Sequence, residues 1–316
     1  MAWDNVLKTI EPDVTHTPFA TLRHAAQQLS QNYRQETPRP TMTREMGLAY
    51  VLTRMPATYH ALLAIFHRMA AKDARHPTSL FDAGAGPGTA VLAASEVFLS
   101  LRTVTALEPD AVMRHLGHRL TASLPLKVHW RDDRLRPSMV LTPHDLVVAS
   151  YVLGELPPEN RDAVLTALWE HATQFLVVVE PGTPEGFKRI RHCRQQLIQQ
   201  GATIVAPCPH AAACPMPPHD WCHFSVRVPR SKWHRQLKGG DAPFEDEKYA
   251  YIVASRHPLD PATARIIRHP WHQPGHIQLT LCTTEGLRQI TVARREGERF
   301  RQARKASWGD AWPPHS

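Results

Sequence analysis

Three cysteines stand in one proline-rich stretch, and their chemistry is that of metal ligands. The stretch runs from Pro207 to Cys222 and also contains Cys208 and Cys214. Its prolines fix φ and remove backbone donors, so it is unsuited to a helix or an inner strand, and its thiols are poorly explained as core residues. Single zinc ions and iron–sulfur clusters both order such loops, usually through four cysteine thiolates. A fourth ligand is therefore required.

Cys193 and Cys282 are the candidates for the fourth ligand. Cys193 falls on the apolar face of a predicted helix, where a buried small side chain is expected. Cys282 ends the strand-like run 277–282, where a thiol can emerge at a sheet edge. We therefore predict a metal site made of Cys208, Cys214, Cys222 and Cys282.

The cysteine spacing does not identify the metal. The pattern C-x5-C-x7-C matches neither the paired C-x2-C of common zinc sites nor the tight ferredoxin run. The neighbouring His210, His219 and His223 keep zinc an alternative, and unliganded buried thiols are a third interpretation. The C-x3-C-x2-C motif of radical enzymes is absent, which argues against radical chemistry.

A glycine-rich loop is the second chemical feature. Residues 81–90 read Phe-Asp-Ala-Gly-Ala-Gly-Pro-Gly-Thr-Ala, and such glycines let backbone amides approach a ligand at a helix N-terminus. The third glycine comes one residue too early for the dinucleotide pattern, which argues against NAD or FAD. Glu108 ends the next predicted strand about twenty residues later, where a carboxylate can hold ribose hydroxyls. The predicted cofactor pocket contains Asp82, Gly84, Gly86, Gly88 and Glu108.

The elements that position these residues are those of an α/β fold. From Ser79 onward, short apolar runs alternate with helical stretches, which indicates a mostly parallel sheet. Strands are expected at 80–83, 104–107, 126–130, 145–149, 175–179, 249–255 and 277–282, with a helix near 185–200. We divide the chain into an N-terminal helical region (1–76), an α/β domain (77–286) with a cysteine-rich metal-binding insertion at about 203–247, and a basic C-terminal extension (287–316).

Composition limits the class of protein. The 316 residues are 42% hydrophobic, which is enough for a large α/β core. No segment is typical of a signal peptide or membrane span, and five cysteines do not make a disulfide framework, so a soluble, cytoplasmic protein is expected. The net charge of +8 favours a polyanionic partner. The sequence does not indicate an oligomeric state.

Two basic segments are candidate RNA contacts. The C-terminal one interleaves Phe300, Trp308 and Trp312 with arginines and lysine, a combination that can grip phosphates and stack bases. Its cations are Arg288, Arg294, Arg295, Arg299, Arg301, Arg304 and Lys305. A second basic segment, 227–238, follows the cysteine loop. A solvated basic face is the alternative interpretation of both segments.

The chain resembles two nested families. The loop at 82–88 with Glu108 resembles class I S-adenosylmethionine-dependent methyltransferases over about residues 79–282. The motifs at 152–157 (Val-Leu-Gly-Glu-Leu-Pro), 179–184 (Val-Glu-Pro-Gly-Thr-Pro) and 248–251 (Lys-Tyr-Ala-Tyr), the cysteine loop and the tail 308–313 (Trp-Gly-Asp-Ala-Trp-Pro) are more particular. Together they resemble the bacterial branch of the mitochondrial small-ribosomal-subunit methyltransferase-like family.

This resemblance implies a cofactor, a metal and a partner. It implies S-adenosylmethionine in the glycine loop and small-subunit, 16S-type ribosomal RNA as partner, in ribosome assembly or translation. It also implies a 4Fe-4S cluster on the residues that match Cys208, Cys214, Cys222 and Cys282, which favours iron–sulfur over zinc.

The reaction itself is weakly indicated. The end of the fourth predicted strand reads Ala-Ser-Tyr-Val at 149–152, which lacks the Asp/Asn-Pro-Pro-Tyr/Phe tetrad of exocyclic-amine methyltransferases and a cysteine nucleophile. Ser150 and Tyr151 are the only catalytic candidates, although methyl transfer can proceed by alignment of the reactants alone. The hypotheses are an rRNA methyltransferase, an assembly factor that keeps the fold without turnover, and a small-molecule methyltransferase.

Overall fold

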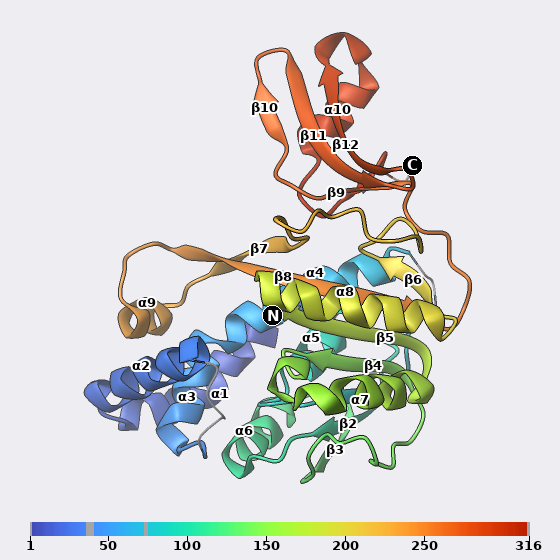
Figure 1. Cartoon of the computed structure of the whole chain (residues 1–316). Helices are drawn as coiled ribbons and strands as arrows, with labels where there is room; N and C mark the ends of the chain where they lie inside the picture. The colour runs from blue at the N-terminus through green and yellow to red at the C-terminus, as the bar shows by residue number, and fades with distance from the viewer. Residues whose placement is uncertain (1, 36–40, 73–74, 315–316) are drawn as a thin grey trace.

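An eight-stranded sheet organises the computed structural model, which describes residues 2–35, 41–72 and 75–314 (Figure 1). Its path is β3-β2-β1-β4-β5-β8-β6, with β7 paired to β8. Strands β1 to β5 are parallel, and β8 runs antiparallel between β5 and β6, which is the arrangement of class I methyltransferases. The bounds are β1 (Ser79–Ala83), β2 (Thr103–Leu107), β3 (Lys127–Arg131), β4 (His144–Ser150), β5 (Ala172–Pro181), β6 (Thr203–Ala206), β7 (Phe224–Pro229) and β8 (Phe244–Ser255). The six strands predicted between residues 80 and 255 are confirmed.

Helices cover both faces of this sheet. Alternate residues of each inner strand enter opposite cores, as the two-residue repeat of a strand requires: Val147 packs on one side and Val148 on the other. One face carries α4 (Met55–Ala70) and α5 (Thr89–Val97), and the other carries α7 (Pro158–His171) and α8 (Pro184–Gln199). The helix α6 (Ala111–Thr121) follows β2.

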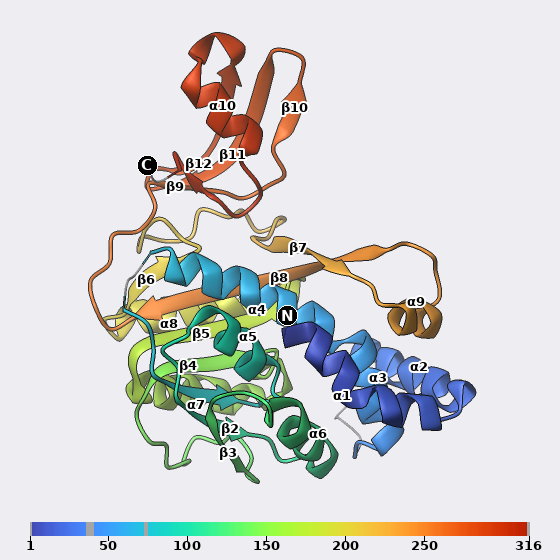
Figure 2. The ribbon, with the colours of Figure 1, turned by 180° about the vertical axis from the view of Figure 1, so that it is seen from behind.

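The N-terminal helical region packs against α5 and α6, beside the sheet. It contains α1 (Ala2–His16), α2 (Phe19–Gln35) and α3 (Arg44–Thr53), and Thr43 caps α3 by accepting a hydrogen bond from the amide of Met46 at 3.2 Å. Gly47 allows α3 close to α6, because a Cβ there would lie 2.8 Å from Leu116 Cδ1. Figure 2 shows α2 and α3 beside α9 (Lys232–Lys238), the helix at the tip of the β7–β8 hairpin. None of the helices described is long and apolar enough to cross a bilayer.

A separate five-stranded antiparallel sheet forms the C-terminal module, defined as residues 264–314. Its strands are β9 (Ala264–Ile266), β10 (Trp271–Gln273), β11 (His276–Thr283), β12 (Gly286–Ala293) and β13 (Ala311–Trp312). The helix α10 (Glu298–Lys305) packs against one face of β11 and β12. The strand predicted at 277–282 is confirmed as β11, but it belongs to this second sheet, which includes residues on both sides of the boundary expected at residue 286.

Candidate cofactor and metal sites

The glycine loop lies where β1 meets α5, at the carboxyl edge of the parallel strands. Gly84, Gly86 and Gly88 all have positive φ, at 76°, 53° and 83°, which favours glycine. At Gly84 a side chain is also excluded by space, because a Cβ would lie 2.7 Å from Val152 Cγ2. Gly88 is the N-cap of α5, so this loop presents its amides at a helix N-terminus.

Glu108 joins this loop to the end of β2. Its Oε2 accepts a hydrogen bond from the amide of Gly86 at 2.9 Å, and its Oε1 accepts one from the amide of Asp110 at the same distance. The Asp110 carboxylate in turn caps α6 through the amides of Val112 and Met113. Gly86 and Glu108, both predicted for the cofactor pocket, are thus in direct contact, and Glu108 joins the glycine loop to the loop after β2.

Asp82 is a buried carboxyl at the base of the same loop. Its side chain is 1% exposed, and neither oxygen has a hydrogen-bond partner among the residues that the structure describes. Burial, together with the nearby Glu108, raises the pKa of Asp82 to about 8. A buried acceptor without a partner costs stability, and a ligand that carries donor groups would remove that cost.

Asp82 makes stability depend on pH in the cofactor-free protein. Because the folded-state pKa of about 8 lies above the ordinary aspartate pKa of 3.8, the folded protein keeps a proton that the unfolded chain releases. The contribution of Asp82 is fully present below about pH 4 and is lost toward pH 8, at about 1.4 kcal/mol per pH unit. Asp82→Asn is expected to raise the free energy of unfolding by about 4 kcal/mol more at pH 8 than at pH 5. Urea denaturation at both pH values measures this, and an equal effect at both would contradict it.

The end of β4 holds the two catalytic candidates. Ser150 is the last residue of β4, and Tyr151 follows it with a φ of 57°, which is unusual for a residue other than glycine. The Tyr151 hydroxyl donates a hydrogen bond to Oε1 of Glu247 at 3.1 Å. Burial and the Glu247 carboxylate raise the pKa of Tyr151 well above its usual value, so Tyr151 keeps its proton at neutral pH.

Glu180, at the end of β5, is a site residue that sequence reasoning missed. It is buried and paired with Arg189 of α8, with 2.6 Å between Nε and Oε2. The amide of Gly154 also faces its Oε1, at 3.4 Å. Despite these partners, burial raises the pKa of Glu180. Glu180 could have been predicted from its position at the end of an apolar strand, which is the feature that identified Glu108.

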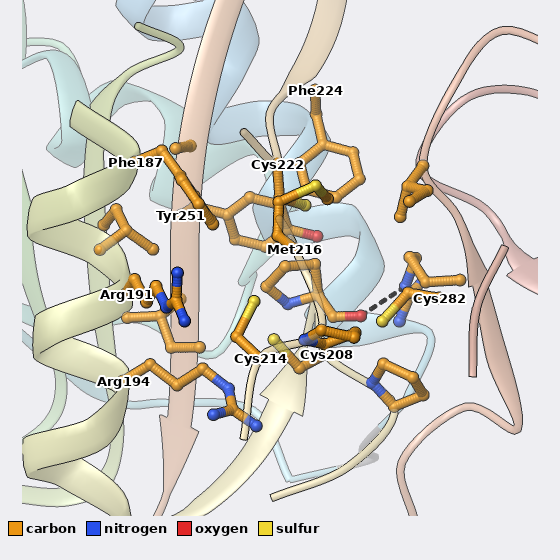
Figure 3. Close-up of a pocket in the computed structure, with 18 of the residues that line it drawn as sticks. Phe187, Arg191, Arg194, Cys208, Cys214, Met216, Cys222, Phe224, Tyr251 and Cys282 are labelled. Atoms are coloured by element: carbon orange, nitrogen blue, oxygen red, sulfur yellow. Dashed lines mark hydrogen bonds between the residues drawn. The ribbon is translucent and has the colours of Figure 1, made fainter. Parts of the chain in front are cut away.

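The four predicted cysteine ligands line one cavity, between α8, the cysteine loop and the C-terminal sheet. Figure 3 shows Cys208 and Cys214 close together, with Cys222 and Cys282 at other parts of the wall. Cys282 comes from β11, so two separate sheets build the cavity. Cys193 is buried in the core under α8 instead and is not among the lining residues.

Two arginines fix the cysteine loop to its surroundings. Arg194 of α8 donates to the carbonyl oxygens of His210 at 2.6 Å and Ala212 at 2.8 Å. Arg265 of β9 donates to the carbonyl oxygens of Pro207 at 2.8 Å and Gly309 at 3.0 Å. The loop backbone is therefore held by a helix of the methyltransferase-like sheet and by a strand of the C-terminal sheet.

Burial sets the protonation of the cavity thiols. It raises the pKa of Cys282 to about 12, with Cys208 and Cys214 adding to the effect. Burial, followed by the other three thiols, raises the pKa of Cys222 well above its usual value. Cys222 and Cys282 are therefore protonated at neutral pH when no metal is bound, and metal ligation would release their protons.

The basic segments differ from expectation. Trp308 and Trp312 are 9% and 4% exposed, so the prediction that they stack on bases is wrong; both pack in the protein interior. Several arginines are already paired with acids: Arg288 with Glu285, Arg299 with Glu296, Arg301 with Glu298 and Arg227 with Asp246. The exposed tryptophan of the C-terminal module is Trp271, on β10.

The strand order and the glycine loop define a protein of the class I methyltransferase-like fold. The chain belongs to the family described as "Mitochondrial small ribosomal subunit Rsm22", whose model matches residues 44–313. It is 29% identical to "Ribosome assembly protein METTL17, mitochondrial" of Homo sapiens, over 86% of this chain and 63% of the human protein. It is 27% identical to "Rsm22-cox11 tandem protein 2, mitochondrial" of Schizosaccharomyces pombe, over 90% of this chain and 45% of that protein. The chain thus spans about half to two thirds of these relatives.

Solved methyltransferase structures are similar at low identity. The magnesium protoporphyrin IX methyltransferase of Synechocystis PCC 6803 has a TM-score of 0.43 and 12% identity, over 73% of this chain and 94% of that one. The precorrin-6y C5,15-methyltransferase of Geobacter metallireducens has a TM-score of 0.41 and 15% identity, over 62% and 87% of the two chains.

Proposed function

We propose that this protein binds S-adenosylmethionine and acts in the cytoplasm, on or with small-subunit ribosomal RNA, during ribosome assembly. The observation that carries the cofactor part is the contact between Glu108 and Gly86 beside the buried Asp82. Family membership and the human relative's name, a ribosome assembly protein, support the ribosomal part. Membership in a bacterial branch of the family stays a prediction.

The residues of the glycine loop fit this cofactor. Asp82 offers an unpartnered carboxyl group, which would release its proton beside an ammonium group, and Glu108 offers oxygens for ribose hydroxyls. When bound, the cofactor supplies an electrophilic methyl group. The chain's own contribution is to orient that cofactor, because positive-φ glycines bring the loop amides close to it.

An assembly factor without methyl transfer is the second candidate, and the state of Tyr151 favours it. Its hydroxyl is engaged by Glu247, and its raised pKa keeps it from acting as a base. Methyl transfer then requires an acceptor atom that is nucleophilic without deprotonation. No observation favours a small-molecule substrate.

We propose further that the four cavity cysteines hold a four-iron cluster. A single zinc ion would need sulfurs about 3.8 Å apart, from tetrahedral geometry and Zn–S bonds of about 2.3 Å. Within the described ranges, no three His, Cys, Asp or Glu side chains are arranged as a metal site, so this proposal rests on the four cysteines that line one cavity and on the resemblance to the family. In a four-iron cluster each cysteine thiolate can bind a different iron. The four cysteine sulfurs therefore lie farther apart than around a single zinc ion. Such a cluster supplies one-electron chemistry when bound.

Label transfer tests the proposed function. Small subunits from cells that lack the protein are incubated with purified protein and methyl-labelled S-adenosylmethionine. Label in small-subunit RNA, reduced by Asp82→Asn with Glu108→Ala, is the result expected of an enzyme. No label, together with binding to these subunits and full complementation by the double variant, would instead establish the assembly factor. Failure to bind small-subunit particles at any stage would overturn both.

A further inference from the structure

One face of the C-terminal sheet is open and polar. Cross-strand partners point to the same side of a sheet, and the register pairs Trp271 with Gln278, Gln278 with Thr291, and Thr280 with Gln289. The other side carries the buried residues that pack with α10. Figures 1 and 2 show this module projecting from the methyltransferase-like body, with α10 against one side of its sheet. We name the open side, made of these five residues, the outer face.

The outer face has the chemistry of a surface for unpaired bases. Trp271 is a large aromatic side chain that is 56% exposed, and exposed aromatic rings stack on bases of any sequence. Beside it lie two amides and two hydroxyls that can donate to and accept from base edges. Nε2 of Gln289 donates a hydrogen bond to Oε1 of Gln278 at 3.3 Å, so these two amides restrain each other on the outer face.

Charge favours a polyanion as the occupant. The C-terminal module contains nine Arg and Lys residues against four Asp and Glu residues, so its net charge is +5 of the chain's +8. Arg294 and Arg295 are exposed directly after β12, at the end of the sheet where β10 lies. Protein–protein interfaces bury an apolar core, but Trp271 is the only large apolar residue among the five of the outer face. The outer face is therefore better suited to RNA than to a protein partner.

We propose that the outer face binds a single-stranded segment of RNA, with one base stacked on Trp271 and phosphates held by the exposed arginines that follow β12. This rests on the proposed function, because it specifies which form of RNA the protein recognises and where. The opposite end of the same side of the sheet carries Cys282 and Leu287, which line the cysteine cavity. The bound strand therefore lies next to the metal site.

Fluorescence anisotropy with a labelled oligouridylate tests this inference on the full-length protein. Trp271→Ala is expected to weaken binding by about 5-fold to 100-fold, the range for loss of one stacked base, and Trp271→Phe is expected to retain most of the affinity. Phe19→Ala is the matched control, since Phe19 is also an exposed aromatic residue, 42% exposed, but lies on α2, outside both basic segments. Duplex RNA is expected to compete poorly.

The outcomes separate this inference from the proposed function. Equal oligouridylate affinity for Trp271→Ala and the wild type would overturn the inference, while small-subunit binding by the wild type would leave the proposed function intact. Weaker binding of Trp271→Ala to small subunits, with unchanged oligouridylate affinity, would identify the outer face as a protein contact and also overturn the inference. An unchanged melting temperature confirms that each variant is folded.

Discussion

Cys222→Ser is expected to remove most of the iron from anaerobically purified protein. The wild type should contain about four irons per chain and absorb broadly near 400 nm, as thiolate-bound iron–sulfur clusters do. Serine lacks the soft thiolate that iron prefers, and Cys222 lines the same cavity as the other three predicted ligands. Cys282→Ser should have the same effect. Iron, sulfide and zinc analysis with visible spectra measure both.

Cys193→Ser provides a matched control. It makes the same chemical change in a cysteine that is buried in the core and does not line the cavity, so full iron content is expected. One zinc per chain in a colourless wild-type protein would contradict the cluster and show that the site holds a single zinc ion. Equal iron loss in the control and in Cys222→Ser would show that destabilisation, and not ligation, caused the loss.

Glu108→Ala is expected to weaken S-adenosylmethionine binding by at least about 10-fold. The substitution removes the acceptor for the amides of Gly86 and Asp110, and hydrogen bonds to a charged group contribute about 1.5 to 3 kcal/mol each. The proposed acceptor for the ribose hydroxyls is lost as well. Isothermal titration calorimetry measures the affinity.

Two variants make this result interpretable. Glu108→Gln keeps the shape and one oxygen, so a smaller loss is expected, whereas Glu285→Ala removes an exposed acid of the C-terminal module and should change nothing. Unchanged affinity in Glu108→Ala would place the cofactor away from the glycine loop. The free energy of unfolding should also fall in Glu108→Ala, because Glu108 joins two loops of the cofactor-free protein.

Local patterns predicted the methyltransferase-like half of the molecule well. The strands β1, β4 and β5 are mainly apolar runs bounded by turns, and the glycine loop follows β1 directly, so a short stretch of sequence is enough to predict them. Glu108 was predictable for the same reason, because parallel strands end at one edge of the sheet. The contact between Gly86 and Glu108 follows from this topology.

Long-range contacts account for what the sequence did not predict. Arg194 and Arg265 look like ordinary basic residues, yet both hold the backbone of the cysteine loop, and Arg265 does so across 58 positions. The strands β9, β10 and β13 have two or three residues each, too few to show a period. Trp312 and Trp271 both stand near basic residues, and only tertiary packing determines that the first is buried and the second exposed.

The position of Cys282 on the C-terminal sheet, apart from the loop that carries the other three predicted ligands, has a consequence for biosynthesis. A chain emerging from the ribosome presents Cys208, Cys214 and Cys222 long before Cys282, and strand β11 must then fold before the fourth thiol reaches the cavity. A nascent or truncated chain that ends before residue 282 offers only three of the four cavity thiols. The proposed metal site is thus complete only after synthesis of the C-terminal module, so a cluster on all four cysteines would mark a chain that is translated and folded through β11.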